Sequence, residues 1–346
     1  MKRARGKNYL IIAVIVLIAG ALAGRWLWNS IAGPAAKFEE ESRILLVPSA
    51  SELDDVIDSL IAIGAIEDEQ KFRWLAEKKN YAAKIRPGRY SIERGMSMNG
   101  MVNKLRAGEQ DPVKVTFTNI DHLPELAGKL AYYLEPDSIT FLNAFMDPEL
   151  HEKAGLDQHT FISLFIPNTY EFWWTTTPEQ FMERMGKEHE AFWTEERKKK
   201  AKEAGLSSTE AATLASIVQA ETMQMEDAPK IAGVYLNRLR VGMPLQADPT
   251  LKFALGLDSL QRVLNKDKMV NSPFNTYRNA GLPPGPINMP EPRFIDAVLK
   301  ATDHNFFYFV AKADMSGHSE FSRNYEQHQV FARKYQRALN ERGIMR

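Results

Sequence analysis

The chain has 346 residues, which is enough for two domains of ordinary size. Lys plus Arg and Asp plus Glu number 44 each, so the net charge is zero, which argues against nucleic acid as the main partner. The absence of cysteine excludes disulfides, thiol nucleophiles and thiolate metal ligands. The seven histidines show no metal-ligand spacing, so we expect neither a metal nor a cofactor.

The N-terminal segment has the pattern of a membrane anchor. Basic residues within 1–8 precede an apolar segment over 9–31, which at about 20 residues is long enough to span a bilayer. Trp26 and Trp28 suit the interfacial belt on the far side. Because basic flanks stay in the cytoplasm, we expect a cytoplasmic tail over 1–8, a single transmembrane helix over 9–31, and the remaining chain outside the cytoplasm. The alternative is a cleaved signal peptide, since residues 21–23 (Ala-Leu-Ala) suit a cleavage site.

A small module is expected over residues 38–112. Apolar periodicity, caps and turns predict a strand, two helices, a second strand and a third helix, over residues 43–47, 51–64, 68–75, 86–92 and 97–108. This order, together with the sequence KIRPGRY at 84–90, resembles the LysM-like module of cell-wall proteins. The resemblance implies a sugar-binding role. The alternative is a spacer that packs on the second domain.

The remaining residues, 113–346, are expected to form a larger α+β domain. Alternation over 112–118 predicts its first strand, and helices are predicted over 123–134, 139–146 and 181–192. The aromatic-dense segment 164–174 is either core or a surface that grips sugar rings. The charge-rich segment 195–203 is typical of a solvated helix face and not of a nucleic-acid patch.

The next predicted helix carries the main candidate for catalysis. Ser207 is its expected N-cap, with Glu210 completing a capping box. Glu221 falls on the apolar stripe of this helix, where a Leu would be expected. A carboxylate in an apolar environment either finds a partner or has a raised pKa, and a raised pKa suits a general acid at neutral pH. The alternative is a glutamate at a helix end that turns to water or pairs with an arginine.

The segments that follow supply candidate binding residues. A helix is predicted over 227–242, with a proline in its first turn. Gln246 is a polar residue in an extended link and is a candidate hydrogen-bonding partner of a substrate. Asp248 precedes a proline, so its alternative role is N-cap of the short helical turn at 251–255.

A long irregular segment, 272–287, contains four prolines and two glycines and is expected to be rigid. Such a loop, carrying Asn275, Thr276 and Tyr277, makes a good cleft wall, although it could also be a surface connection. Beyond it the pattern predicts a helix over 291–301, a closing hairpin within 306–325, and a C-terminal helix that packs on the domain.

Five blocks occur in order along the chain. They are LASIVQAET at 214–222, VYLNRLRVGMPLQADPT at 234–250, SPFNTY at 272–277, GLPPGPI at 281–287 and HSEFS at 318–322. In this order the chain resembles the endolytic murein transglycosylases of the YceG-like family, over nearly its whole length. Two positions depart from the family pattern: Gln219, where the family often has Glu, and residues 323–324 (Arg-Asn), where it often has Lys-Thr.

The resemblance implies cleavage of the β-1,4 bond between N-acetylmuramic acid and N-acetylglucosamine within glycan strands. The muramic C6 hydroxyl attacks its own anomeric carbon and leaves a 1,6-anhydro end. The family's catalytic glutamate corresponds to Glu221, acting as general acid and then as base. The residues we expect to bind substrate are Gln246, Asp248, Asn275, Thr276, Tyr277 and Ser322.

Two other functions stay open at this point. A two-carboxylate muramidase would use Asp248 or Glu226 beside Glu221. A non-catalytic cell-wall binder or scaffold would hold glycan strands without cleaving them. Family and location imply peptidoglycan strands as the substrate, peptidoglycan synthases (penicillin-binding proteins) as partners, and a periplasmic catalytic domain tethered to the inner (plasma) membrane.

Overall fold

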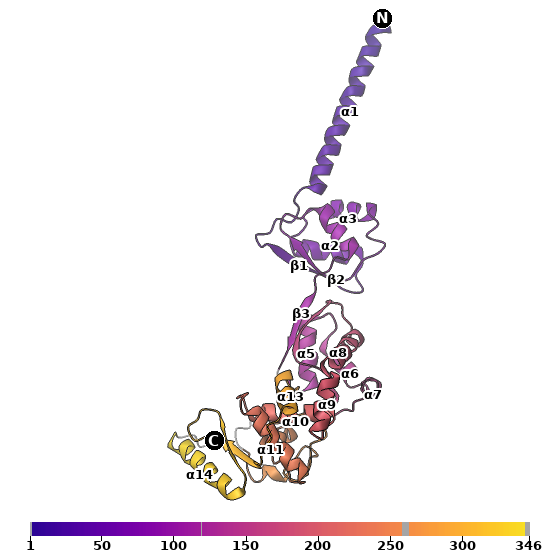
Figure 1. Ribbon diagram of the computed structural model, residues 1–346. Coiled ribbons are helices and arrows are strands. Elements are labelled where there is room, and N and C mark those ends of the chain that lie inside the picture. The colour runs from indigo at the N-terminus through magenta and orange to yellow at the C-terminus, as the bar shows by residue number, and fades with distance from the viewer. Residues whose placement is uncertain (1, 119, 258–262, 343–346) are drawn as a thin grey trace. The chain divides into compact units, whose positions relative to one another are not determined.

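The structure is a computed structural model that describes residues 2–118, 120–257 and 263–342 (Figure 1). The chain divides into two compact units. The first comprises residues 1–114, 133–135 and 171–176, and the second comprises 115–132, 136–170 and 177–346. Each unit buries its own apolar cluster, as expected for a chain of this length.

The first unit combines a long N-terminal helix with a small mixed module (Figure 1). Its elements are α1 (Lys2–Ala32), β1 (Ser42–Val47), α2 (Leu53–Ala62), α3 (Glu69–Lys78), β2 (Gly88–Glu93) and α4 (Met98–Ala107). Strands β1 and β2 pair antiparallel, with Leu45 opposite Tyr90, and both side chains are fully buried. The predicted strand–helix–helix–strand order is therefore confirmed, whereas the LysM-like resemblance stays a prediction.

The caps of the first unit follow local sequence signals. Asp68 and Ser97 accept hydrogen bonds from the first turns of α3 and α4, and for Asp68 this cap was predicted. Gly108 ends α4 with a φ of 72°, a left-handed conformation that glycine adopts at little cost. The cap of α2 is Glu52, because the Asp55 carboxylate accepts a hydrogen bond from the Glu52 N–H.

Helix α1 covers the predicted anchor and its basic flank without a break. Over the part of the chain that the structure describes, no helix combines the length and the hydropathy needed to cross a membrane. The anchor stays a prediction from the sequence.

The second unit is mainly helical. Strands β3 (Val113–Phe117) and β4 (Asn168–Phe172) form a two-stranded sheet, and the division of the chain between the units runs through both strands. The other elements are α5 (Leu123–Tyr133), α6 (Ser138–Phe145), α7 (Pro148–Lys153), η1 (Phe161–Leu164), α8 (Pro178–Phe192), α9 (Glu195–Glu203), α10 (Ser208–Glu221), α11 (Ala228–Arg240), α12 (Asp248–Leu255), η2 (Asp267–Met269), α13 (Pro292–Leu299), β5 (Tyr308–Ala311), β6 (Ser319–Ser322) and α14 (Tyr325–Glu341).

Helix α10 lies at the centre of the second unit and packs against α11 and α13 (Figure 1). Its predicted capping box is present, since the Ser207 Oγ accepts from the Glu210 N–H and the Glu210 carboxylate accepts from the Ser207 N–H. Burial extends over every residue from 211 to 218, and not over a single stripe. The small side chains on this segment let neighbouring helices approach on several sides, so α10 is a core helix rather than an amphipathic surface helix.

The aromatic-dense segment belongs mainly to the core. Phe165 and Tyr170 are buried, and the Tyr170 ring stacks on that of Phe117 with 5.3 Å between centroids. Trp173 differs, with 52% of its surface exposed. The core interpretation is therefore confirmed for most of this segment.

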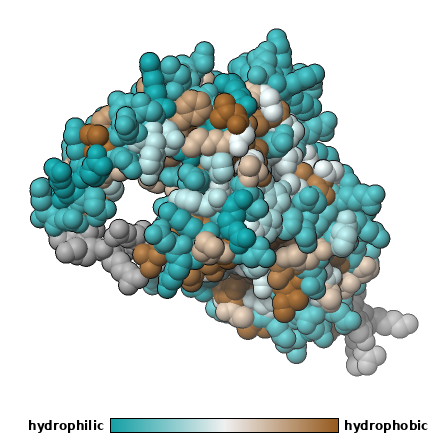
Figure 2. Space-filling model, turned by 90° about the horizontal axis from the view of Figure 1, so that it is seen from below, coloured by the Kyte–Doolittle hydropathy of each residue, from teal (hydrophilic) through white to brown (hydrophobic). Residues whose placement is uncertain are grey.

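Strands β5 and β6 form the predicted hairpin, with Tyr308 opposite Ser322. Helix α14 lies beside this hairpin (Figure 1), but none of its residues is buried. The predicted packing of this helix on the domain is therefore confirmed, since α14 packs against the hairpin without entering the core. Figure 2 shows a surface that is mostly hydrophilic, with hydrophobic residues in small separate patches.

Candidate active site

One cavity of about 280 Å³ in the second unit brings together predicted residues from three segments. Glu221 ends α10, Gln246 lies just before α12 and Asp248 begins it, and Tyr277 lies on the proline-rich loop. The lining residues are Glu221, Tyr235, Arg238, Leu245, Gln246, Asp248, Tyr277, Tyr308, Phe309, Tyr325 and His328. Four of the seven residues predicted from the sequence thus share one cavity.

Glu221 has the electrostatic character of a general acid. The pKa of its carboxyl group is raised to about 7, chiefly by burial, and the nearby charge of Asp248 contributes to this rise. The Tyr235 hydroxyl opposes this shift, because it donates a hydrogen bond to Glu221 Oε1 at 2.7 Å and so favours the ionised form. The other oxygen, Oε2, accepts no hydrogen bond from the described residues. A carboxyl group that is about half protonated near neutral pH can both donate and accept a proton.

Asp248 and Tyr277 form a second polar pair in the cavity. The Tyr277 hydroxyl donates a hydrogen bond to Asp248 Oδ1 at 2.5 Å. Asp248 is the first residue of α12, and Ala247 holds the cap position, so the N-cap alternative for Asp248 is wrong. Its carboxylate therefore lines the cavity, where it accepts a hydrogen bond from Tyr277, and does not cap its own helix. Burial and the bond to Asp248 both raise the pKa of Tyr277, so this phenol stays protonated and remains a donor.

Gln246 is presented to the cavity by an unusual backbone. Its φ of 51° lies in the left-handed region, which a residue with a Cβ adopts at some cost. The Gln246 N–H donates to the Thr276 carbonyl at 3.1 Å, which ties this link to the proline-rich loop. The side chain remains exposed, so its amide is accessible for hydrogen bonding.

Asn275 and Thr276 are buried beneath the cavity wall and do not line the cavity. The Asn275 side chain donates to the carbonyls of Lys268 and Val270 and accepts from the Tyr277 N–H, which orients the tyrosine. The Thr276 hydroxyl accepts from the Ala247 N–H at 3.0 Å and lies 2.8 Å from the Thr250 hydroxyl. Thr276 therefore joins the two loops that carry Asp248 and Tyr277, whereas the side-chain bonds of Asn275 stay within residues 268–277.

Ser322 and Glu226 do not line the cavity either. Ser322 is fully buried in β6, opposite the cavity residue Tyr308, and its Oγ has no hydrogen-bond partner among the described residues. Glu226 is exposed and does not line the cavity. Of the two candidate second carboxylates, only Asp248 shares the cavity with Glu221.

Sequence reasoning missed Arg238 and the aromatic wall of the cavity, which is formed by Tyr308, Phe309, Tyr325 and His328. Arg238 is buried in α11, where its Nε donates to the Phe307 carbonyl at 2.7 Å and its Nη1 to the Leu245 carbonyl at 2.5 Å. It therefore joins the hairpin to the segment that carries Gln246. A signal was present, because Arg238 lies three residues after Tyr235 on the predicted apolar face of α11.

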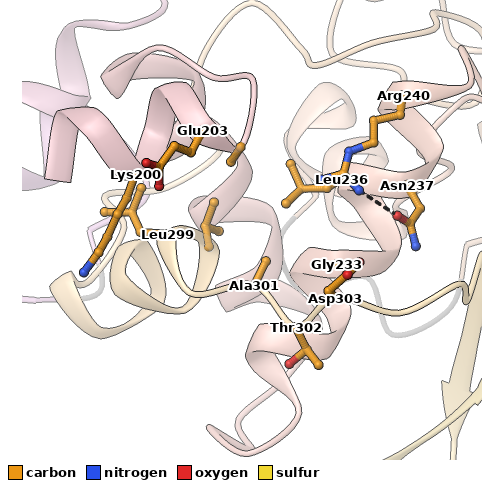
Figure 3. Close-up of a pocket in the computed structure, with 12 residues that line it drawn as sticks. Lys200, Glu203, Gly233, Leu236, Asn237, Arg240, Leu299, Ala301, Thr302 and Asp303 are labelled. Atoms are coloured by element: carbon orange, nitrogen blue, oxygen red, sulfur yellow. Dashed lines mark hydrogen bonds between the residues drawn. The ribbon is translucent and has the colours of Figure 1, made fainter. Parts of the chain in front are cut away.

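Figure 3 shows a second cavity, of about 310 Å³, bordered by α9, α11 and the end of α13. Its carboxylates, Glu203 and Asp303, are exposed to solvent. A general acid at neutral pH needs a carboxyl group shielded from water, which this cavity does not offer. We therefore place the candidate active site at the cavity around Glu221. Within residues 2–118, 120–257 and 263–342, no group of three or more His, Asp or Glu residues is arranged to hold a metal ion.

The family model described as the YceG-like family matches residues 45–334. The match covers most of the chain, and the protein belongs to this family. A relative named endolytic murein transglycosylase, from Bacillus subtilis, is 28% identical, over 93% of this chain and 92% of the relative. A protein of the same name from Streptococcus pneumoniae is 25% identical, over 93% of this chain and 63% of the relative.

A crystal structure of a YceG-like protein from Listeria monocytogenes has a similar fold, with a TM-score of 0.57 and 26% identity. The similarity covers 84% of this chain and 98% of that one. At one position where this chain departs from the family pattern, Gln219 Oε1 accepts a hydrogen bond from the Glu291 N–H at 2.7 Å. A glutamate could accept the same bond, so this departure preserves the contact.

Proposed function

We propose that this protein is an endolytic murein transglycosylase, a lyase that cuts peptidoglycan glycan strands internally and leaves 1,6-anhydro-N-acetylmuramic acid ends. The observation that carries this proposal is the environment of Glu221. Its carboxyl group lies in a cavity, has a pKa of about 7, and has one oxygen bonded to Tyr235 and the other unengaged. The names of the relatives from Bacillus subtilis and Streptococcus pneumoniae support the same reaction.

The reaction needs one carboxyl group, since the substrate supplies the nucleophile. Protonated Glu221 donates its proton to the glycosidic oxygen while the bond from that oxygen to the muramic C1 breaks. The C6 hydroxyl of the same sugar attacks C1, and its proton passes to the Glu221 carboxylate, which restores the acid. No water is consumed and no cofactor is required. Attack within one sugar ring also benefits from the high effective concentration of the hydroxyl.

Product analysis tests the proposal directly. Purified glycan strands incubated with the full-length protein should give fragments whose masses sum to that of the substrate, with anhydromuramic ends. Fragments that carry one added water and a free reducing end would instead identify a hydrolase. Glu221→Gln should reduce cleavage by about 10²–10⁴-fold in the same assay, because the amide cannot exchange a proton with the substrate.

A two-carboxylate muramidase is the second candidate, since Asp248 lines the same cavity as Glu221. In that enzyme Asp248 would activate water or form a covalent intermediate, and its removal would abolish cleavage. In a transglycosylase Asp248 shapes the environment of Glu221, so an Asp248→Asn variant should retain measurable cleavage and still produce anhydro ends. A third candidate, a non-catalytic binder, would be supported if Glu221→Gln left glycan cleavage unchanged while binding of strands persisted.

We also propose that residues 9–31 anchor the protein in the inner (plasma) membrane and leave the catalytic unit in the periplasm. The support is the basic flank, the apolar segment and the tryptophans of the sequence. Fusion of a reporter that is active only outside the cytoplasm to the C-terminus tests this orientation; a signal only from a cytoplasmic reporter would contradict it.

The LysM-like module and the synthase partners are proposals of the same kind. Sugar binding by residues 38–112 is supported by the observed order of its elements. Such binding would hold a strand near the catalytic unit. Association with peptidoglycan synthases would let cleavage terminate a growing strand. Pull-down of the isolated module with insoluble peptidoglycan tests the first of these proposals.

A further inference from the structure

The aromatic wall of the candidate active site contains a side chain that the proposed chemistry does not use. Tyr325, the first residue of α14, is 58% exposed, yet it lines the cavity that contains Glu221. Leaving a large ring in water forgoes roughly 25 cal/mol for each Å² of apolar surface that could be buried. An exposed ring in a cavity wall therefore suggests that a ligand covers it.

Two elements assemble three rings at this place. Tyr325 and His328 lie three residues apart on α14 and so share a face of the helix. Their ring centroids are 6.1 Å apart, with 30° between the planes. Tyr308 of β5 stacks on His328 with centroids 5.3 Å apart, and its centroid lies 5.9 Å from that of Tyr325. All three residues line the cavity.

Tyr308, the ring of this group that contacts Arg238, is held in place. The guanidinium of Arg238 lies 5.2 Å from the centroid of the Tyr308 ring, and Arg238 is itself fixed by two backbone carbonyls. Tyr308 therefore contacts a cation as well as His328. Tyr325 is the ring whose surface remains available.

His328 contributes an uncharged surface. Burial and the nearby charge of Arg238 both lower the pKa of its imidazole, so the ring is neutral near pH 7. Its Nδ1 has no hydrogen-bond partner among the described residues, so at this atom the ring is not held by a hydrogen bond. A neutral ring next to an exposed tyrosine forms a continuous aromatic surface.

We propose that Tyr325 and His328, supported by Tyr308, form an aromatic platform that binds one N-acetylhexosamine ring of the glycan strand beside Glu221. The apolar C–H face of a pyranose ring suits such a surface, while its hydroxyls remain free to bond with the polar residues of the cavity. This inference rests on the proposed function. It assigns to α14 the role of covering one sugar ring during cleavage.

Binding without cleavage tests the platform. In a full-length Glu221→Gln background, peptide-free glycan strands should bind about tenfold more weakly after Tyr325→Ala, equivalent to about 1.4 kcal/mol. Tyr325→Phe should restore most of the binding, because the ring face is kept. With Glu221 intact, Tyr325→Ala should raise KM more than it lowers kcat, because the platform lies outside the proton transfer.

The matched control is Tyr335→Ala, on the same helix but outside the cavity lining, which should bind strands as the parent does. Thermal unfolding of each variant verifies that α14 remains in place. If folded Tyr325→Ala binds as tightly as the control, the platform is wrong although cleavage by the parent protein stands. If the parent protein produces no anhydro ends, the proposed function itself fails.

Discussion

The Tyr235 hydroxyl donates a hydrogen bond to Glu221 Oε1, with 2.7 Å between the two oxygens, and thereby joins the central helices α10 and α11 at the reacting carboxyl group. This bond lowers the pKa of Glu221 and partly offsets the raising effect of burial. The neighbouring charge of Asp248 acts in the opposite direction, because it raises that pKa. Removal of the Tyr235 hydroxyl and removal of the Asp248 charge should therefore shift the pH dependence of cleavage in opposite directions.

Tyr235→Phe should move the loss of activity at alkaline pH to higher pH. The variant keeps the ring but cannot donate to the carboxylate, so the ionised form of Glu221 is less favoured and the acid stays protonated further up the pH scale. The measurement is kcat/KM against pH for release of anhydro ends, with the parent losing activity above pH 7 as its pKa of about 7 requires. A shift toward lower pH would contradict the role assigned to the phenol.

Asp248→Asn should move the same alkaline limb to lower pH. Removing a negative charge near Glu221 favours ionisation of the glutamate, so the protonated acid is lost earlier as pH rises. Amide replacement preserves an acceptor for the Tyr277 hydroxyl, which limits disturbance of the loop. An unchanged pH profile would mean that the two carboxylates do not interact, and complete loss of cleavage would favour the muramidase.

Glu221→Gln should lower activity by about 10²–10⁴-fold and yet stabilise the fold at alkaline pH. The carboxyl group has a pKa of about 7 when folded and an ordinary value of 4.5 when exposed to water, so the folded state binds the proton more tightly. In the parent, stability therefore falls as pH rises from 4.5 to 7, and the neutral amide escapes this penalty. At pH 8 the variant should be more stable by about 3 kcal/mol in urea unfolding, with the difference vanishing below pH 4.5. A parent more stable than the variant at pH 8 would refute the buried-acid interpretation.

Gly233→Ala should destabilise the second unit. A Cβ at this position in α11 would lie 2.5 Å from the Thr302 carbonyl oxygen, and the backbone of that segment is itself tied to α11 through the Pro229 carbonyl. Overpacking of this kind costs about 1–3 kcal/mol, which exceeds the gain of about 1 kcal/mol expected from the higher helix propensity of alanine.

Gly186→Ala in α8 is the matched control for that substitution, because a Cβ there meets nothing within 4 Å. It should leave stability unchanged or raise it by up to about 1 kcal/mol. Urea unfolding of both variants provides the comparison. Equal effects of the two substitutions would show that the close approach of residues 302–304 to α11 does not hold in solution.

Helices and caps were predictable because their signals are local. Ser207 and Glu210 form the expected capping box, and Asp68 caps α3, since a cap depends on residues within one turn. The extent of burial was not predictable in the same way. Helix α10 is surrounded by α11 and α13, and the sequence of α10 does not specify how many neighbours it meets.

In the candidate active site, too, some features follow from local sequence and others only from packing. The position of Glu221 on an apolar stripe indicated a perturbed carboxyl group, because burial and periodicity are linked along one helix. Its hydrogen bond to Tyr235 depends on the packing of two helices. Asn275 and Thr276 were predicted to bind substrate, but the fold places them beneath the cavity wall, where Asn275 orients Tyr277 and Thr276 joins two loops.

Local sequence therefore sufficed to predict most of the elements, the caps at Asp68 and Ser207, the proline-rich wall and the candidate acid, since each depends on neighbours within a few residues. Tertiary packing alone decided which side chains meet at the cavity. Arg238, Tyr308 and Tyr325 reach it from α11, β5 and α14. No short-range pattern relates these distant segments, because their meeting depends on how the helices and the hairpin pack. The same packing withdraws Glu221 from water, and that loss of solvation produces its raised pKa.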